Sequence, residues 1–380
     1  MQITVDRQLL LNQLSYISKA IPNKSPLPAL TGIKFVVMEE GLFLTSSDSD
    51  ITINTFLPLE VDDTQVIEIE EVGAIIIPGK YFIEIIKKLN GTSIEISTFE
   101  GNYITIKCGR SEYTLNGFHI NEYPNIELIK NEDAIHLEMQ LLKSIIRQTG
   151  FSVANSENRP ALTGVNFRYD EDELVCIATD SFRLSKKVVP LAKSPKPFNI
   201  VIPGRSLNEL SKILDDSHHS IDMYLSSNQV LFQAGNLSFQ SRLLDGIYPD
   251  TNEFTPKTFG IEIKADYQEL YNAFDRAALI ARDQLANVVK IDILPNEEKL
   301  VIKANSPDVG KMEEVVNIKI IQGSELRIAG SALFVLDALK AIHNPNSEVV
   351  MAFNGEMHPF ILKECNDEST IQLIVPVRME

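Results

Sequence analysis

The 380-residue sequence contains no tryptophan and only three cysteines, Cys108, Cys176 and Cys365, which lie far apart. Separated cysteines in odd number, without a C-x-x-C motif, fit buried thiols better than disulfides or a cysteine-based zinc site. No apolar run reaches the roughly 18 residues that a membrane-spanning helix needs. The N-terminal segment also lacks a secretory signal pattern. We therefore expect a cytoplasmic protein with no membrane span.

Sequence motifs of common enzymes and metal sites are also missing. There is no G-x-G-x-x-G, no G-x-x-x-x-G-K-[ST] and no H-E-x-x-H. The adjacent pair His218 and His219 lies in a polar stretch typical of a solvated loop. We expect no catalytic residue, no metal and no cofactor. One alternative is an enzyme with a site at Asp180 and Ser181, although these residues lack the G-x-S-x-G context of a hydrolase nucleophile.

Basic residues are scarce relative to acidic ones, and the net charge is −17. Taken alone, this balance argues against a non-specific nucleic-acid binder, but net charge does not say where the charges lie. The content of apolar residues, 44%, and of charged residues, 23%, is that of an ordinary globular protein. At roughly 100–200 residues per domain, the length predicts two or three domains.

Short motifs recur in the same order at intervals of roughly 125–132 residues. The stretch ALTG at 29–32 recurs at 161–164, and YP at 123–124 recurs at 248–249 and as VP at 375–376. The stretch IPGK at 77–80 recurs as IPGR at 202–205 and more weakly as IAGS at 328–331. The ordered set predicts three copies of one unit, with domains 1–128, 129–256 and 257–380.

Each copy has the same predicted plan of a helix, strands, a second helix and a closing pair of strands. Apolar spacings of three and four residues predict helices at 7–20, 79–90, 137–149, 205–214, 266–282 and 331–343. Alternating patterns predict strands at 33–37 and 165–169 and closing pairs at 93–97 with 103–108, 220–225 with 230–234, and 348–353 with 360–364. The predicted fold class is α+β, with three strand-rich domains of two helices each.

The six predicted helices together carry more lysine and arginine than aspartate and glutamate, although the whole chain is acidic. Lysine favours helices, but glutamate favours them as well and is scarce here. We therefore expect two faces of opposite charge, with the helices on the basic one.

Four stretches make the whole chain resemble the β subunit of bacterial DNA polymerase III, the sliding-clamp family. They are LPAL at 27–30, ATDSFRL at 178–184, DGIYPD at 245–250 and LIVPVRM at 373–379. The resemblance implies a clamp architecture in which a homodimer closes into a ring of six domains around double-stranded DNA. It implies a non-catalytic processivity factor that tethers the replicative polymerase. It also implies partnership with the clamp loader and with other proteins that carry a clamp-binding motif.

The resemblance also implies three sets of site residues. A pocket for a short peptide containing glutamine and leucine would involve Leu162, Thr179, Ser181, Phe182, Arg183, Leu184, Pro249, Leu373, Ile374, Val375, Pro376, Val377, Arg378 and Met379. DNA would be faced by Lys24, Lys80, Lys87, Arg159 and Arg205. The dimer seam would join Arg110, Tyr113 and Leu115 to Leu279, Ile280, Asp308, Glu313 and Glu314 of the partner chain.

The chain departs from the family pattern at several of these places. Glu253 stands near a position that is often basic, so the polar rim of the pocket is expected to differ. Pro160 and Ala161 replace two aromatic residues, which removes a contact expected with DNA. Lys311 interrupts the acidic run of the seam, and Glu380 extends past the usual end. A second alternative is a repeat-built protein–protein scaffold that does not bind DNA.

Overall fold

The computed structural model of the chain describes residues 1–99, 102–129, 133–156, 158–191, 196–214, 219–251, 254–282, 287–342, 344 and 346–379. Their contacts gather into two compact units, one of residues 1–141 and 208–243 and the other of residues 142–207 and 244–380. The second predicted repeat therefore contributes strands to both units. The predicted limits at 128 and 256 do not coincide with this division and stay predictions.

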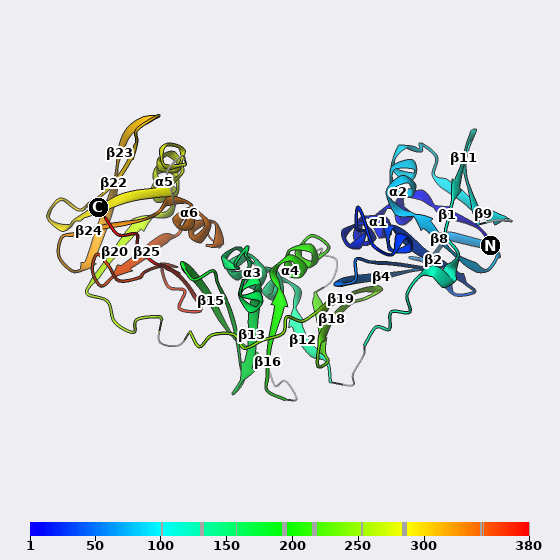
Figure 1. Cartoon of the computed structure of the whole chain (residues 1–380), viewed down its shortest axis with the longest axis horizontal. Helices are drawn as coiled ribbons and strands as arrows, with labels where there is room; N and C mark the ends of the chain where they lie inside the picture. Colours follow the sequence, from blue (N-terminus) through cyan, green and yellow to red (C-terminus); the bar gives the residue numbers. More distant parts are fainter. Residues whose placement is uncertain are drawn as a thin grey trace. The chain divides into compact units, whose positions relative to one another are not determined.

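Two α-helices lie in each predicted repeat of the described chain, within a few residues of the predicted positions (Figure 1). They are α1 (Arg7–Ile17), α2 (Gly79–Lys88), α3 (Met139–Thr149), α4 (Gly204–Ser211), α5 (Tyr267–Ala281) and α6 (Ala332–Ala341). The prediction of two helices per repeat is thus confirmed. None of the helices in the described residues is long and apolar enough to cross a membrane.

Strands of the first unit form a five-stranded sheet, an eight-stranded sheet and a small hairpin. The five-stranded order is β11 (Ser111–Asn116), β10 (Tyr103–Cys108), β9 (Ser93–Phe99), β1 (Gln2–Asp6) and β7 (Ile67–Glu71). The eight-stranded order is β12 (Ile135–Glu138), β17 (Ser220–Leu225), β18 (Gln229–Ala234), β19 (Leu237–Arg242), β4 (Ile51–Pro58), β3 (Gly41–Ser47), β2 (Gly32–Met38) and β8 (Gly73–Pro78). The hairpin joins β5 (Glu60–Val61) to β6 (Thr64–Gln65).

Strands of the second unit form one twelve-stranded sheet. Its order begins β16 (Phe198–Pro203), β13 (Gly164–Asp170), β14 (Glu173–Thr179), β15 (Arg183–Pro190), β27 (Thr370–Ile374) and β26 (Phe360–Glu364). It continues β25 (Glu348–Phe353), β20 (Ile261–Asp266), β23 (Gly310–Gln322), β22 (Lys299–Ser306), β21 (Val288–Leu294) and β24 (Leu326–Ser331). The predicted strands and closing pairs correspond to β2, β13, β9 with β10, β17 with β18, and β25 with β26, which confirms them.

The same cap starts the first helix of the first and third repeats. The Asp6 carboxylate accepts a hydrogen bond from Leu9 N at 2.8 Å, and the Asp266 carboxylate accepts one from Glu269 N at 2.9 Å. Each satisfies a backbone donor that has no partner inside the helix. The caps therefore fix where α1 and α5 begin, directly after β1 and β20.

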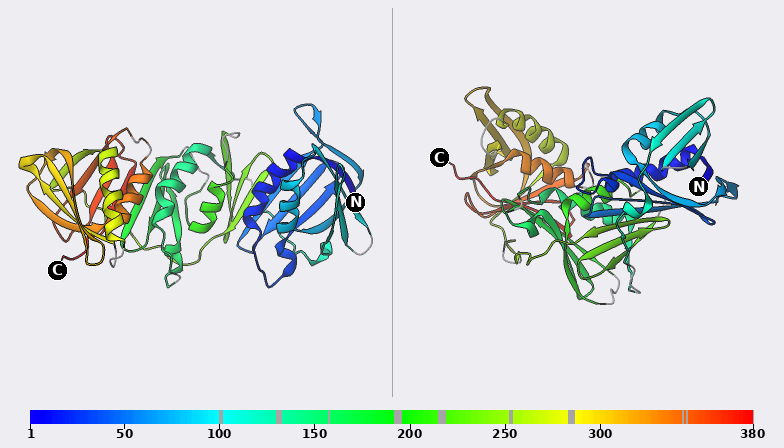
Figure 2. Two further views of the ribbon diagram at one scale, coloured as in Figure 1. Left: turned by 90° about the horizontal axis from the view of Figure 1, so that it is seen from above. Right: turned by 45° about the vertical axis from the view of Figure 1, so that its right-hand side comes forward.

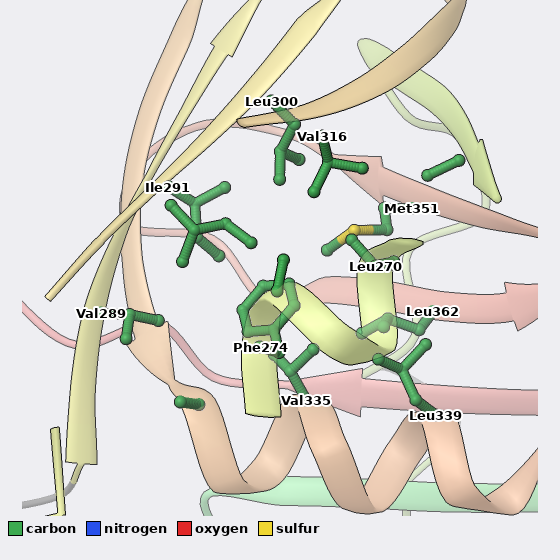
Figure 3. Close-up of a cluster of buried hydrophobic side chains, with 14 of the residues drawn as sticks. Leu270, Phe274, Val289, Ile291, Leu300, Val316, Val335, Leu339, Met351 and Leu362 are labelled. Carbon is green, nitrogen blue, oxygen red and sulfur yellow. The ribbon is translucent and has the colours of Figure 1, made fainter. Parts of the chain in front are cut away.

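Helices α5 and α6 pack together over the sheet and close the core of the third repeat (Figure 3). Phe274 of α5 points toward Val335 of α6, while Ile291 and Leu300 reach the same cluster from the strands (Figure 3). All four side chains are essentially inaccessible to solvent. At about 25 cal/mol per Å² of apolar area buried, such a cluster holds both helices on the sheet.

Helices α1 and α2 pack side by side in the first repeat (Figure 2). Leu10, Leu14 and Ile17 form the buried stripe of α1. The Arg7 guanidinium donates to the carbonyls of Ile86 and Lys87, both at 3.1 Å. A cation at these last carbonyls complements the helix dipole, so Arg7 ties α1 to the end of α2.

Strand pairing also joins one repeat to the next, which the sequence did not predict. In the first unit β4 pairs with β19, with Ile51 opposite Ser241. In the second unit β15 pairs with β27, with Leu184 opposite Leu373. Each of these sheets is therefore shared by two consecutive repeats.

Candidate functional site

A tight turn between β14 and β15 contains the predicted residues Thr179 to Leu184. Thr179 Oγ1 donates to Arg183 O at 2.6 Å and accepts from Ser181 N at 3.1 Å. Asp180 Oδ1 accepts from Phe182 N and Arg183 N, both at 2.9 Å. Ser181 has a φ of +78°, which the side chains on either side stabilise. These hydrogen bonds therefore hold the backbone of the turn in one conformation.

The Arg183 guanidinium is occupied within the chain. Nε donates to Asp180 at 3.0 Å, Nη1 to Asp337 at 2.7 Å, and Nη2 to the Phe151 carbonyl at 2.7 Å. The guanidinium also lies over the Phe334 ring, 4.5 Å from its centroid. Arg183 thus holds the turn against α6, and its predicted part in a peptide pocket stays a prediction.

Apolar side chains gather around this turn, and we name them the apolar patch: Phe182, Leu184, Leu373 and Val375. Leu184 and Leu373 are buried in one cluster, whereas Phe182 is 64% exposed and Val375 37% exposed. Val375 N donates to Phe182 O at 2.9 Å, which joins the two exposed members. The patch therefore combines a buried base with exposed apolar groups that can bury a partner.

The chain from 244 to 249 borders the patch. Tyr248 packs against the cluster of Leu184 and Leu373, and Pro249 beside it is exposed. The backbone at Gly246, with φ +113°, runs past the Ala161 side chain, so this segment lies beside the turn that carries buried Leu162. Ile247 is 96% exposed, and sequence reasoning had not selected it.

The C-terminal tail leaves the sheet after Ile374, which is buried together with Leu373. Val377 N donates to Ala329 O at 2.8 Å, whereas Arg378 is exposed. Pro376, Val377 and Met379 are partly exposed. The structure thus brings the tail to the patch through Val375 and anchors it by two backbone hydrogen bonds.

The sequence did not predict a row of buried polar side chains that joins β15 to β27. Gln372 Nε2 donates to Gln148 O at 2.9 Å, and Gln372 Oε1 accepts from the Ser185 hydroxyl. Lys187 Nζ donates to Ser369 and Thr370 at 2.7 and 2.9 Å. Burial lowers the pKa of Lys187 below its usual value. Because buried polar groups are costly when unpaired, this row fixes the register between β15 and β27.

The predicted DNA-facing residues are all exposed. In the first unit Lys24 lies in the loop between Ala20 and Pro28, and Lys80 and Lys87 lie on α2. Lys87 makes a surface pair with Glu84 at 3.3 Å. In the second unit Arg159 directly precedes the turn at Pro160, and Arg205 lies in the first turn of α4. Each cation is thus open to solvent, and its contact with DNA stays a prediction.

The first half of the predicted seam lies on an unprotected sheet edge. β11 pairs only with β10 and ends the five-stranded sheet of the described residues. Tyr113 is exposed on β11, Leu115 is half-buried, and Arg110 is exposed in the turn before it. An exposed edge strand with apolar side chains is a natural place for another chain to add a strand.

The second half of the seam lies in the third repeat. Leu279 near the end of α5 is 61% exposed, whereas Ile280 packs partly against the chain's own core. β22 pairs with β23 from Gly310 onward, but among the described residues β20 pairs with β23 only from Ile318. The first part of β23 therefore also has a free edge.

The acidic residues of this half differ in their availability. The Glu314 carboxylate accepts hydrogen bonds from Nε and Nη2 of Arg276, at 2.7 and 2.8 Å, and these hydrogen bonds lower the pKa of Glu314. Glu313 lies 3.4 Å from Lys303. Asp308 is exposed. Glu314 is consequently the least available of the three for an ion pair with another chain.

Comparison with known proteins places these features in one family. The models of the N-terminal, central and C-terminal domains of the DNA polymerase III β subunit match residues 1–127, 136–250 and 253–378. The β sliding clamp of Staphylococcus epidermidis is 42% identical over 378 residues, which is 100% of this chain and 99% of the relative.

Solved structures agree over the whole length. The DNA polymerase sliding clamp of Bacillus subtilis matches with a TM-score of 0.94 and 41% identity, covering 100% of both chains. The DNA polymerase III β chain of Streptococcus pneumoniae matches with a TM-score of 0.93 and 34% identity, again covering 100% of both chains. This chain therefore belongs to the DNA polymerase III β subunit family of sliding clamps.

Proposed function

We propose that two copies of this chain close into a ring around duplex DNA and tether the replicative polymerase, the clamp loader and other motif-bearing proteins to it. The match of all three repeats to sliding clamps, over the full length, carries this proposal. The proposed domains are 1–128, 129–256 and 257–380. The ring would act in the cytoplasm as an accessory factor, not as an enzyme.

Two free strand edges support closure of the ring. β11 of one chain would lie along the first part of β23 of the other, so that each seam continues a sheet across the dimer. Leu115 and Leu279 would be buried there, with Tyr113 covering them. Surface ion pairs contribute only ~0–1 kcal/mol each, so the strand and apolar contacts would hold the seam.

Contact with DNA would come from the exposed cations Lys24, Lys80, Lys87, Arg159 and Arg205. Long cations reach phosphates without reading bases, which allows the ring to slide. The acidic remainder of the chain would repel DNA from the outer surface. Pro160 and Ala161 make the contact near Arg159 purely ionic.

Tethering would use the apolar patch together with Leu162, Pro249 and the tail to Met379. A leucine side chain of the partner would bury itself against Phe182 and Val375. Thr179, Ser181 and Arg183 would keep the turn in shape. A bound polymerase would then stay at high local concentration near the primer end.

The test is retention on DNA of defined topology. The purified chain, loaded on nicked circular DNA by a clamp loader, should remain bound in high salt and leave when the circle is cut. Light scattering should give about 85 kDa, twice the 42.6 kDa of one chain. Equal retention on linear and circular DNA would contradict encirclement.

A further inference from the structure

A second turn in the first unit repeats the geometry of the turn at Thr179–Arg183. Over Ser47–Ile51, the Ser47 hydroxyl donates to Ile51 O at 2.9 Å and accepts from Ser49 N at 3.2 Å. Asp48 Oδ1 accepts from Asp50 N and Ile51 N at 3.1 and 2.8 Å. Ser49 has a φ of +84°. The two turns therefore share every side-chain hydrogen bond to their backbone.

The elements around the two turns also correspond. Arg242 N donates to Asp50 O at 2.9 Å, as Val375 N donates to Phe182 O. Each position of the first ladder therefore has an equivalent in the second. Asp50 is equivalent to Phe182, Thr52 to Leu184, Gln240 to Leu373, and Arg242 to Val375. The backbone platform is thus duplicated, while every member of the apolar patch is replaced by a polar residue.

The first-unit platform carries a cavity of about 300 Å³. Leu30 and Ile126 supply part of its wall, and Asp50, Gln229, Gln240 and Arg242 line it as well. Gln240 is buried and already committed, because its amide donates to Glu127 O at 3.2 Å and accepts from Ile129 N at 3.0 Å. The linker after the first repeat is thereby held along one side, and the cavity beside it stays open.

Three charged side chains line this cavity, those of Asp50, Glu127 and Arg242. The Arg242 guanidinium and the Asp50 carboxylate are exposed, and neither makes a side-chain hydrogen bond or ion pair with the residues that the structure describes. An unpaired guanidinium selects a carboxylate, and a carboxylate selects an N–H donor. The side chains therefore favour a hydrophilic ligand that presents one acidic group to Arg242 and N–H donors to the carboxylates of Asp50 and Glu127.

We propose that this cavity is a second peptide site, which takes an extended hydrophilic segment with an acidic side chain on Arg242 and an asparagine or glutamine amide on Asp50. Its interpretation as a peptide site rests on the proposed tethering role of the matching patch in the second unit. The chain would then hold two kinds of linear peptide at once, an apolar one at the patch and an acidic one at the cavity.

The test uses a set of N-acetylated pentapeptide amides in which each position is varied among Asp, Glu, Asn, Gln and Ser. At least one peptide should bind saturably to the full chain and shift the methyl resonances of Leu30 and Ile126. Arg242→Leu should weaken it by about tenfold or more, as expected for loss of a charge-assisted hydrogen bond. Phe182→Ala should leave its affinity unchanged. If no peptide shows binding that depends on Arg242, the proposal is overturned.

A second experiment replaces polar residues of the cavity by the equivalent residues of the apolar patch. The variant Asp50→Phe, Thr52→Leu and Arg242→Val, which keeps Gln240, should bind two leucine-containing peptides per chain where the parent binds one. A folded variant that still binds one refutes the structural equivalence of the platforms. If the parent binds no leucine-containing peptide, the tethering proposal fails by itself, and the acidic-peptide measurement still decides this one.

Discussion

Arg183 donates to the Asp337 carboxylate at 2.7 Å and thereby connects the turn before β15 to α6. The Arg183 side chain is only 12% exposed, and its loss leaves Asp180, which is 17% exposed, and Asp337, which is 34% exposed, without their shared partner. We expect Arg183→Leu to lower the free energy of unfolding by roughly 2–4 kcal/mol. Urea titration measures this. The control is Lys212→Leu, which breaks an exposed pair with Glu209 and should cost less than ~1 kcal/mol; equal costs would contradict the structural role of Arg183.

Phe182→Ala should weaken binding of a synthetic peptide that contains glutamine and leucine by about tenfold or more, because Phe182 is an exposed apolar anchor. Its melting temperature should not change.

Deletion of residues 375–380 should weaken binding of the same peptide by ~30- to 1000-fold. The deletion also removes the hydrogen bonds of Val375 and Val377, so a small loss of stability is expected with it. Calorimetry measures the affinity, with Met357→Ala as an exposed apolar control; unchanged affinity in both test variants would place the peptide elsewhere.

Leu279→Arg should prevent dimerisation without unfolding the chain. The Leu279 side chain is exposed in the single chain, so the arginine stays solvated there, whereas an unpaired guanidinium buried in a seam costs several kcal/mol. Sedimentation at nanomolar concentration should find the variant monomeric. Val72→Arg changes a similarly exposed apolar residue outside the proposed seam and should remain dimeric. A dimeric Leu279→Arg variant would show that the seam lies elsewhere.

Replacing both Lys24 and Arg159 by alanine should weaken DNA binding and reduce its dependence on salt. Each phosphate contact contributes roughly one unit to the slope of log K against log salt, so the slope should fall by about two. Fluorescence anisotropy with primed DNA measures it. Lys299→Ala, which removes an exposed lysine paired with Glu297, should leave the slope unchanged. An unchanged slope in the double variant would make Lys24 and Arg159 ordinary surface charges.

Acid stability should depend on Asp292. Burial opposes its ionisation, but hydrogen bonds from Arg327 at 2.6 Å and Lys303 at 3.1 Å outweigh it and hold the pKa of the carboxyl below its usual value. Asp292 therefore adds stability above about pH 4, and this contribution is lost as pH falls below that point. Asp292→Asn should be less stable near pH 7 and should lose less stability between about pH 5 and pH 2. Parallel pH curves of the two proteins would contradict this assignment.

The helices and local strand pairs could be predicted because their signals are local. The stripe of Leu10, Leu14 and Ile17 needs only about two turns of context. The alternation that marks β2 and β13 is equally local. The pairing of Leu184 with Leu373, in contrast, depends on a strand at the far end of the chain. A sequence pattern specifies which face of a strand is buried but not which distant strand covers its edge.

The candidate site shows the same limit. The motif at 178–184 marked the turn, but the occupation of the Arg183 guanidinium by Asp337 could not be predicted, because the two residues lie in different repeats. The buried row of Ser185, Gln148 and Gln372 was missed for the same reason. The roles of the seam and DNA-facing residues stay predictions.

The pairing of β4 with β19 delays the completion of the first sheet while the chain is being synthesised. The edge of β4 receives its partner only after the ribosome has made Arg242, long after the rest of the first repeat has emerged. Until then the nascent chain presents an open strand edge, which is a template for association with other nascent chains. The edge of β15 waits in the same way for the residues up to Ile374, which belong to the third repeat. Translation speed and chaperone access over these two intervals should therefore govern the yield of native protein more than the stability of any one repeat.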